Sequence, residues 1–125
     1  MRKLILLVLV FSIAAPALAW APGGAQNFLE RAERLKAKGP LAFFDSDYGR
    51  LKAEATAVGV SIGDDRIAAE KAGRPILYCS PRPRAQLGSF EFIDGLKAIP
   101  AAERSRMSLK DAMLRVLQRK YPCRR

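Results

Sequence analysis

Histidine is absent from this chain of 125 residues. Its absence excludes the commonest general base, the commonest metal ligand and every Ser–His or Cys–His nucleophile arrangement. The sequence also contains no glycine-rich phosphate loop, no GxSxG nucleophile elbow and no zinc-ligand spacing. These absences favour a binding protein over an enzyme, and they predict that the protein uses no metal and no cofactor.

Carboxylates are also scarce, with 12 acidic residues against 22 basic ones. Two close acidic pairs stand out, Asp45 with Asp47 and Asp64 with Asp65. Both pairs lie where helix amino termini need hydrogen-bond acceptors, so we expect them to cap helices. Catalysis or calcium binding is the alternative, but neither pair lies in the loop of alternating oxygen ligands that a calcium site needs.

Long apolar runs are absent from all but the amino terminus. There, a short basic start precedes Leu4–Ala15, and Ala17-Leu18-Ala19 gives the small-x-small pattern that a signal peptidase cleaves. The alternative is an uncleaved anchor, because the apolar stretch reaches Ala21 and is just long enough to span a bilayer. We expect residues 1–19 to be a signal peptide. Residues 20–125 should then form one periplasmic or secreted domain without a stable membrane span.

The net charge of +10 is unevenly distributed. Residues 20–73 contain eight basic and eight acidic residues, whereas residues 74–125 contain twelve basic and four acidic ones. Such a basic field attracts anionic partners and speeds their encounter. For an exported protein this favours an acidic protein face or an anionic envelope surface, and an ordinary basic protein without such a partner is the alternative. Nucleic acid is not expected as a partner, because the chain lacks an aromatic stacking platform.

Only two cysteines are present, Cys79 and Cys123. An even count in a small exported domain indicates one disulfide. A redox-active pair is the alternative, but such pairs normally have a CxxC spacing and one thiol of low pKa. The wide separation of these two cysteines therefore favours a structural disulfide.

Four segments have apolar residues at helical spacing, and no segment is a convincing strand. Asn27 and Ser108 begin capping boxes at the starts of the first and the last of these segments. For the second, two helices broken near residues 59–64 are the alternative, because glycines there weaken a helix. The sequence predicts an all-α fold, a small single-domain bundle of about four helices closed by one disulfide. The expected helices are 27–38, 46–72, 89–98 and 108–121.

Two of the segments that connect the expected helices allow a prediction of their exposure to solvent. Leu41–Phe44 is a short apolar connector that we expect to be buried. Ser80–Arg84 has prolines at two alternate positions and cannot be helical. We therefore expect a stiff, basic, exposed loop that is tethered on one side by Cys79.

The carboxy-terminal half resembles the Rap/Tai family of type VI secretion immunity proteins. The family pattern has a cysteine closely followed by a proline, then two helices, and a terminal aromatic-Pro-Cys. The resemblance implies a small, exported, helical protein, closed by a disulfide between Cys79 and Cys123. It also implies binding to a peptidoglycan amidase effector in the periplasm, often as a homodimer. The residues that carry the resemblance are Tyr78-Cys79-Ser80-Pro81, Phe90–Ile99, Met107-Ser108-Leu109 and Lys120-Tyr121-Pro122-Cys123.

If the resemblance holds, the mechanism is occlusion of the effector's active site by a preordered loop. Residues 80–88 are the candidate, with Ser80, Arg82, Arg84 and Gln86 as the partner-binding residues. Prolines and the neighbouring disulfide reduce the entropy lost on binding, and the arginines can pair with acidic groups. We therefore expect Arg82→Glu combined with Arg84→Glu to weaken binding without unfolding the domain.

Two alternatives stay open at this point. The loop could be a solvated connector without binding energy of its own. The whole protein could instead be a basic, envelope-associated structural or binding protein with no toxin partner, held to anionic lipid or glycan. Simple surface attachment should weaken steeply with ionic strength, whereas a packed protein interface should survive.

Overall fold

The computed structural model describes residues 20–81 and 84–124, so the expected signal peptide lies outside the described residues. Within that part the chain forms helices and connecting turns, and no strand. The predicted all-α class is confirmed. The expected bundle of about four helices is correct only in part, because the short segments η1 and α5 add to the longer helices. In order, the elements are α2 (Gly24–Ala37), η1 (Gly39–Phe44), α3 (Ser46–Ala72), α4 (Ser89–Ala98), α5 (Ala101–Arg104) and α6 (Leu109–Lys120).

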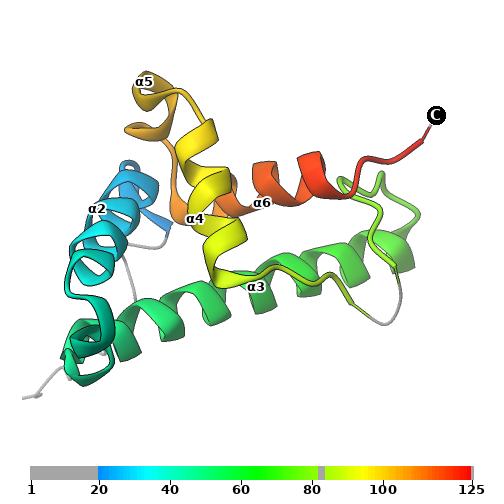
Figure 1. The fold of residues 1–125 in the computed structure, drawn as a ribbon. Helices are drawn as coiled ribbons and strands as arrows, with labels where there is room; N and C mark the ends of the chain where they lie inside the picture. Colours follow the sequence, from blue (N-terminus) through cyan, green and yellow to red (C-terminus); the bar gives the residue numbers. More distant parts are fainter. Residues whose placement is uncertain (1–19, 82–83, 125) are drawn as a thin grey trace, which may run out of the picture.

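The long helix α3 runs along one side of the molecule, and the other helices lie on the same side of it (Figure 1). Helices α2 and α6 contact α3 and each other, and α4 contacts both α2 and α6. The 3-10 helix η1 joins α2 to the start of α3, while the loop after α3 lies at the opposite end. None of the helices in the described part is both long enough and apolar enough to cross a membrane.

One apolar core joins these helices. The rings of Phe28 on α2 and Phe92 on α4 lie 5.5 Å apart between centroids. The largest fully buried side chains come from three helices and the connector after α4. The predicted stripe on α3 contributes Leu51, Val58 and Ile62 to the core. These largest fully buried side chains belong to Val58, Leu96, Ile99 and Leu109.

Helices α4 and α6 approach closely at Gly95. A Cβ atom added to Gly95 would lie 2.7 Å from both Cγ atoms of Val116. Real carbon atoms do not pack at that distance, so glycine at this position allows the two helices to meet.

Helix α3 is continuous, as the apolar stripe predicted, and the alternative with a break near residues 59–64 is wrong. Asp45 caps its amino terminus by accepting a hydrogen bond from the Asp47 backbone N–H at 2.8 Å. The predicted capping role of Asp64 and Asp65 is wrong, because both lie inside α3. Contacts with α2 and α6 along its length offset the helix-weakening effect of the glycines.

The predicted capping box at Asn27 is also wrong. Helix α2 begins three residues earlier, after Gly23, whose φ of 82° lies in the left-handed region. The early start is fixed by a tertiary contact, since the Ala25 backbone N–H donates to the Met107 carbonyl at 3.2 Å. At the last helix the prediction is confirmed, because the Ser108 hydroxyl accepts from the Asp111 backbone N–H at 3.0 Å.

The prediction that Leu41–Phe44 is buried is wrong. Of these four residues, only Ala42 packs against the core, and the other three are exposed. The segment forms the 3-10 helix η1, which has about three residues per turn and therefore presents only one of its three faces to the core.

Candidate protein-binding loop

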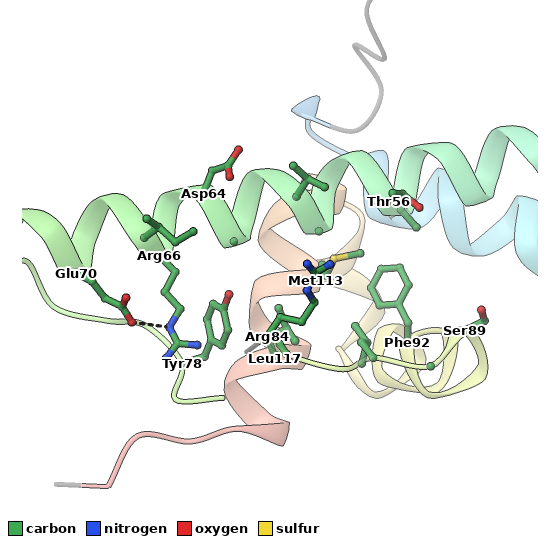
Figure 2. Close-up of a pocket in the computed structure, with 18 residues that line it drawn as sticks. Thr56, Asp64, Arg66, Glu70, Tyr78, Arg84, Ser89, Phe92, Met113 and Leu117 are labelled. Atoms are coloured by element: carbon green, nitrogen blue, oxygen red, sulfur yellow. Dashed lines mark ion pairs between the residues drawn. The ribbon is translucent and has the colours of Figure 1, made fainter. Parts of the chain in front are cut away.

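The segment after α3 folds back beside that helix and forms one wall of a groove. The groove has a volume of about 770 Å³, and α3 forms its opposite wall (Figure 2). The buried side chains of Tyr78, Phe92 and Met113 lie along its lining, while Val60 and Ile67 of α3 are exposed beside it. In the predicted loop of residues 80–88, the stretch after the undescribed residues 82–83 contributes to this lining, with Arg84, Ala85, Leu87 and Gly88.

Arg84 is exposed at the rim of the groove, and Gln86 is exposed two residues further along the loop. Both were predicted as partner-binding residues, and their side chains are accessible in the structure. The predicted partner-binding residue Arg82 lies outside the described residues. An exposed guanidinium at the edge of an apolar groove can pair with a carboxylate on an approaching protein.

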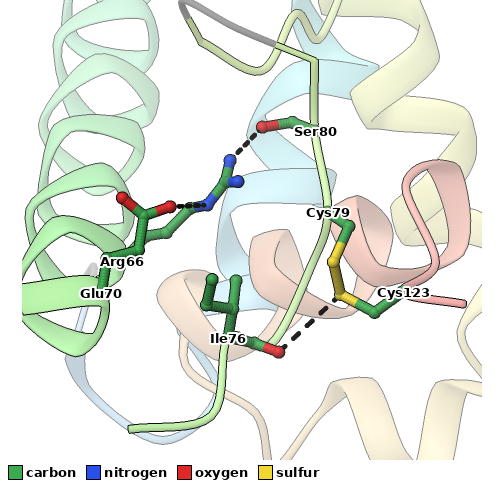
Figure 3. The surroundings of a disulfide bond; sticks show 6 residues. All are labelled: Arg66, Glu70, Ile76, Cys79, Ser80 and Cys123. Carbon is green, nitrogen blue, oxygen red and sulfur yellow. Dashed lines mark hydrogen bonds and ion pairs between the residues drawn. A yellow bond between two sulfur atoms is a disulfide. The ribbon is translucent and has the colours of Figure 1, made fainter. Parts of the chain in front are cut away.

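A disulfide joins the start of this loop to the segment after α6 (Figure 3). Cys79 and Cys123 are bonded, with Cα atoms 4.9 Å apart and a sequence separation of 44. Beside the bond, the Cys79 backbone N–H donates to the Tyr121 carbonyl at 2.8 Å. The predicted pairing is confirmed, and no free cysteine is found in the described part.

The later part of the loop, at Gln86, is also held at the carboxy-terminal end of α6. The Tyr121 hydroxyl accepts from the Gln86 backbone N–H at 3.2 Å and donates to the Gln86 carbonyl at 3.0 Å. The Lys120 ammonium also donates to that carbonyl, at 2.6 Å. Lys120 further donates to the Glu91 carboxylate, and this hydrogen bond raises the pKa of Lys120. Residues 79 and 86 are thus both held at the end of α6.

The expected exposure of Ser80, a predicted partner-binding residue, is wrong, because its side chain points inward. It is buried, and its hydroxyl accepts a hydrogen bond from the Arg66 guanidinium of α3. The same guanidinium lies over the Tyr78 ring, 5.1 Å from its centroid, and pairs with Glu70 at 3.4 Å. Burial raises the pKa of Tyr78, so the phenol stays neutral beside this cation. The position of Ser80 therefore suits a residue that holds the loop against α3.

No family model, curated protein or solved structure matches this chain. The resemblance to the Rap/Tai family therefore stays a prediction from the quoted residues. The site presents the exposed polar side chains of Arg84 and Gln86 together with the exposed apolar side chains of Val60 and Ile67.

Cysteine and carboxylate side chains are scattered over the described residues. Among them, no group of three or more cysteine, aspartate or glutamate side chains is placed to hold a metal ion. The carboxylates near the groove, Asp64 and Glu70, come from α3, and Glu70 pairs with Arg66. The charged residues in the groove lining are thus two arginines, Arg66 and Arg84, and these two carboxylates.

Sequence reasoning missed the contacts that fix the loop. Arg66 and Tyr121 are 14 and 35 residues away from Ser80 and Gln86, their respective partners. The sequence did offer one signal, the position of Tyr121 directly before Pro122-Cys123. A disulfide to Cys79 brings the neighbours of Cys123 close to the loop that begins at Cys79, so a contact between Tyr121 and this loop could have been predicted.

Proposed function

We propose that this protein is an exported immunity-type binding protein that blocks a secreted peptidoglycan amidase. The loop at residues 80–88 is the proposed contact, and it acts by covering the active site of the amidase. The protein performs no reaction of its own.

The observation that carries this proposal is the restraint on the loop. The disulfide at Cys79 and the paired hydrogen bonds between Gln86 and Tyr121 hold it at two points. Ser80 adds a third attachment, to α3. A loop ordered before binding loses less conformational entropy in the complex, so more of the contact energy appears as affinity. Restraint of an exposed loop at three points is more than a simple connector needs.

Charge supports the same proposal. The carboxy-terminal half carries twelve basic and four acidic residues, and Arg84 is exposed at the groove rim. Basic groups around a contact surface speed the encounter with an acidic partner and favour one docking orientation. The proposed partner therefore has carboxylates at the edge of its cleft, where Arg84 can pair with them.

The test is a titration against a secreted peptidoglycan amidase encoded by a neighbouring reading frame. We expect the wild-type protein to bind it and to stop its hydrolysis of peptidoglycan. The Arg84→Glu substitution should weaken binding by about tenfold or more, because it replaces an attraction by a repulsion.

Arg106→Glu is the matched control. Arg106 is also exposed and basic, and the substitution changes the net charge equally, but it precedes α6, whereas the loop is held at the other end of that helix. We expect it to leave affinity nearly unchanged. Equal affinities for wild type and the Arg84 variant would remove the loop from the mechanism, and failure to bind any such amidase would remove the immunity function.

A further inference from the structure

The end of the molecule that carries η1 presents large apolar side chains to solvent. Leu41 and Phe43 are each 69 % exposed, and Phe44 is 89 % exposed. Tyr48, at the start of α3, lies beside them, with its ring 5.3 Å from that of Phe43 in an edge-on arrangement. These four residues are called the aromatic corner. Large exposed apolar side chains that cluster on a folded domain are typical of an interaction site.

Backbone geometry holds the corner outward. Gly39 has a φ of 57°, which only glycine adopts readily, and Pro40 stands at the start of η1, where its fixed φ fits a helical turn. In a 3-10 helix, residues three apart share a face. Leu41 and Phe44 therefore lie together on one face, while Ala42 faces the core.

Exposed cations lie on both helices that flank the corner. Lys36 near the end of α2 and Arg50 and Lys52 in the first turns of α3 are all exposed. The nearby carboxylates are already paired, since Asp45 binds Lys38 and Asp47 binds Arg31. An adjoining pocket of about 610 Å³ includes two lysines and no acidic residue in its lining.

We propose that the aromatic corner docks on the surface of an anionic phospholipid bilayer. Leu41, Phe43 and Phe44 enter the headgroup region, and the surrounding cations contact lipid phosphates. Protruding apolar side chains flanked by exposed lysine and arginine combine the two attractions that hold peripheral proteins to membranes.

Charge and shape favour a bilayer over other occupants. In a symmetric dimer the same patch faces itself, so the cations that flank the corner of one copy would be brought close to those of the second copy. A protein partner would need cavities that match the corner, since Leu41 and Phe44 lie outside the adjoining pocket. A lipid surface accepts protruding side chains without matched cavities.

This inference goes beyond the proposed function and concerns a separate surface. Helix α3 has 27 residues, which rise about 1.5 Å each and give a helix length of roughly 40 Å. The aromatic corner lies at its start and the loop of residues 80–88 near its end (Figure 1). A molecule docked through the corner would still present the loop to a protein partner.

The test is sedimentation with vesicles of equal parts phosphatidylethanolamine and phosphatidylglycerol, compared with vesicles of phosphatidylcholine alone. The full chain is expressed, and the protein for the assay is purified from the fraction that leaves the cells without detergent. We expect preferential binding to the anionic vesicles. Phe43→Ser combined with Phe44→Ser should weaken it by about tenfold or more, and so should Lys36→Glu combined with Lys52→Glu.

Val60→Ser combined with Ile67→Ser is the matched control, because it also removes two large exposed apolar side chains, but from the groove. This control and Arg84→Glu should both bind vesicles like wild type, and thermal unfolding should show that every variant is folded. Three results would each overturn the proposal. They are no binding to anionic vesicles, equal binding by the Phe43/Phe44 variant, and a dimer that this variant abolishes while vesicle binding persists.

Discussion

The close approach of α4 and α6 makes Gly95→Ala a sharp test of the packing. Replacing glycine by alanine inside an exposed helix stabilises it by up to about 1 kcal/mol. Here the new methyl group would lie 2.7 Å from both Cγ atoms of Val116, which is itself buried and cannot move freely. Overpacking of this kind costs roughly 1–3 kcal/mol. The clash therefore outweighs the gain in helix propensity, and we expect a net loss of about 1 kcal/mol in the free energy of unfolding.

The assay is urea denaturation of four proteins, namely wild type, Gly95→Ala, Val116→Ala and the double variant. Val116→Ala alone should cost about 2 kcal/mol, because it removes two buried carbons. In the double variant the space left by Val116 accommodates the new methyl group, so its loss should be smaller than the sum of the single losses by about 1 kcal/mol.

Gly63→Ala is the control for this cycle. Gly63 lies within α3, and nothing is within 4 Å of the position that its Cβ would take. We expect this variant to be more stable than wild type by up to about 1 kcal/mol. The reasoning is refuted if Gly95→Ala is stabilising like the control, or if the effects at Gly95 and Val116 simply add.

Three further predictions concern covalent, electrostatic and capping contacts. Replacing Cys79 and Cys123 by serine should lower the free energy of unfolding by about 4 kcal/mol, because the unfolded chain regains the freedom of an open loop; urea denaturation measures this, and an unchanged midpoint would contradict it. The Arg31 guanidinium hydrogen-bonds Asp47 and holds the pKa of that carboxyl below its usual 3.8. The pairing therefore stabilises the folded protein above this value, and the stabilisation is lost as the pH falls through the lower folded pKa. Arg31→Met should make the free energy of unfolding less dependent on pH at the acid end, and an equally steep dependence would refute the pairing. Ser108→Ala should cost about 1 kcal/mol through loss of the α6 cap, a result that thermal unfolding can check and that an unchanged melting temperature would exclude.

Patterns within one segment predicted the fold well. The apolar stripe through Leu51, Val58 and Ile62 kept its phase across Gly59, and α3 is one helix as expected. The disulfide between Cys79 and Cys123 followed from a count of two in a chain with a predicted leader. The helix is determined by residues that are neighbours in the sequence, and two cysteines can form only one disulfide.

Prediction failed where a distant part of the chain decides the outcome. Helix α2 begins before Asn27 because the Ala25 backbone N–H bonds to Met107, far along the sequence. The apolar character of Leu41–Phe44 suggested burial, yet burial needs an opposing surface, and the short turn η1 meets the core on one face only. At the candidate loop, exposure of Arg84 was predictable, whereas the inward position of Ser80 depends on Arg66.

The disulfide divides the chain into a closed ring and an open arm. Residues 79–123 form the ring, which contains α4, α5 and α6, while α2, η1 and α3 precede it. An ion pair at 2.6 Å between Lys110 of the ring and Asp65 of α3 links the two parts. Proteolytic nicking of any one peptide bond inside the ring leaves both fragments on one covalent molecule, so a protease that cuts the exposed segment near Arg84 does not release a piece until a reductant opens the bond.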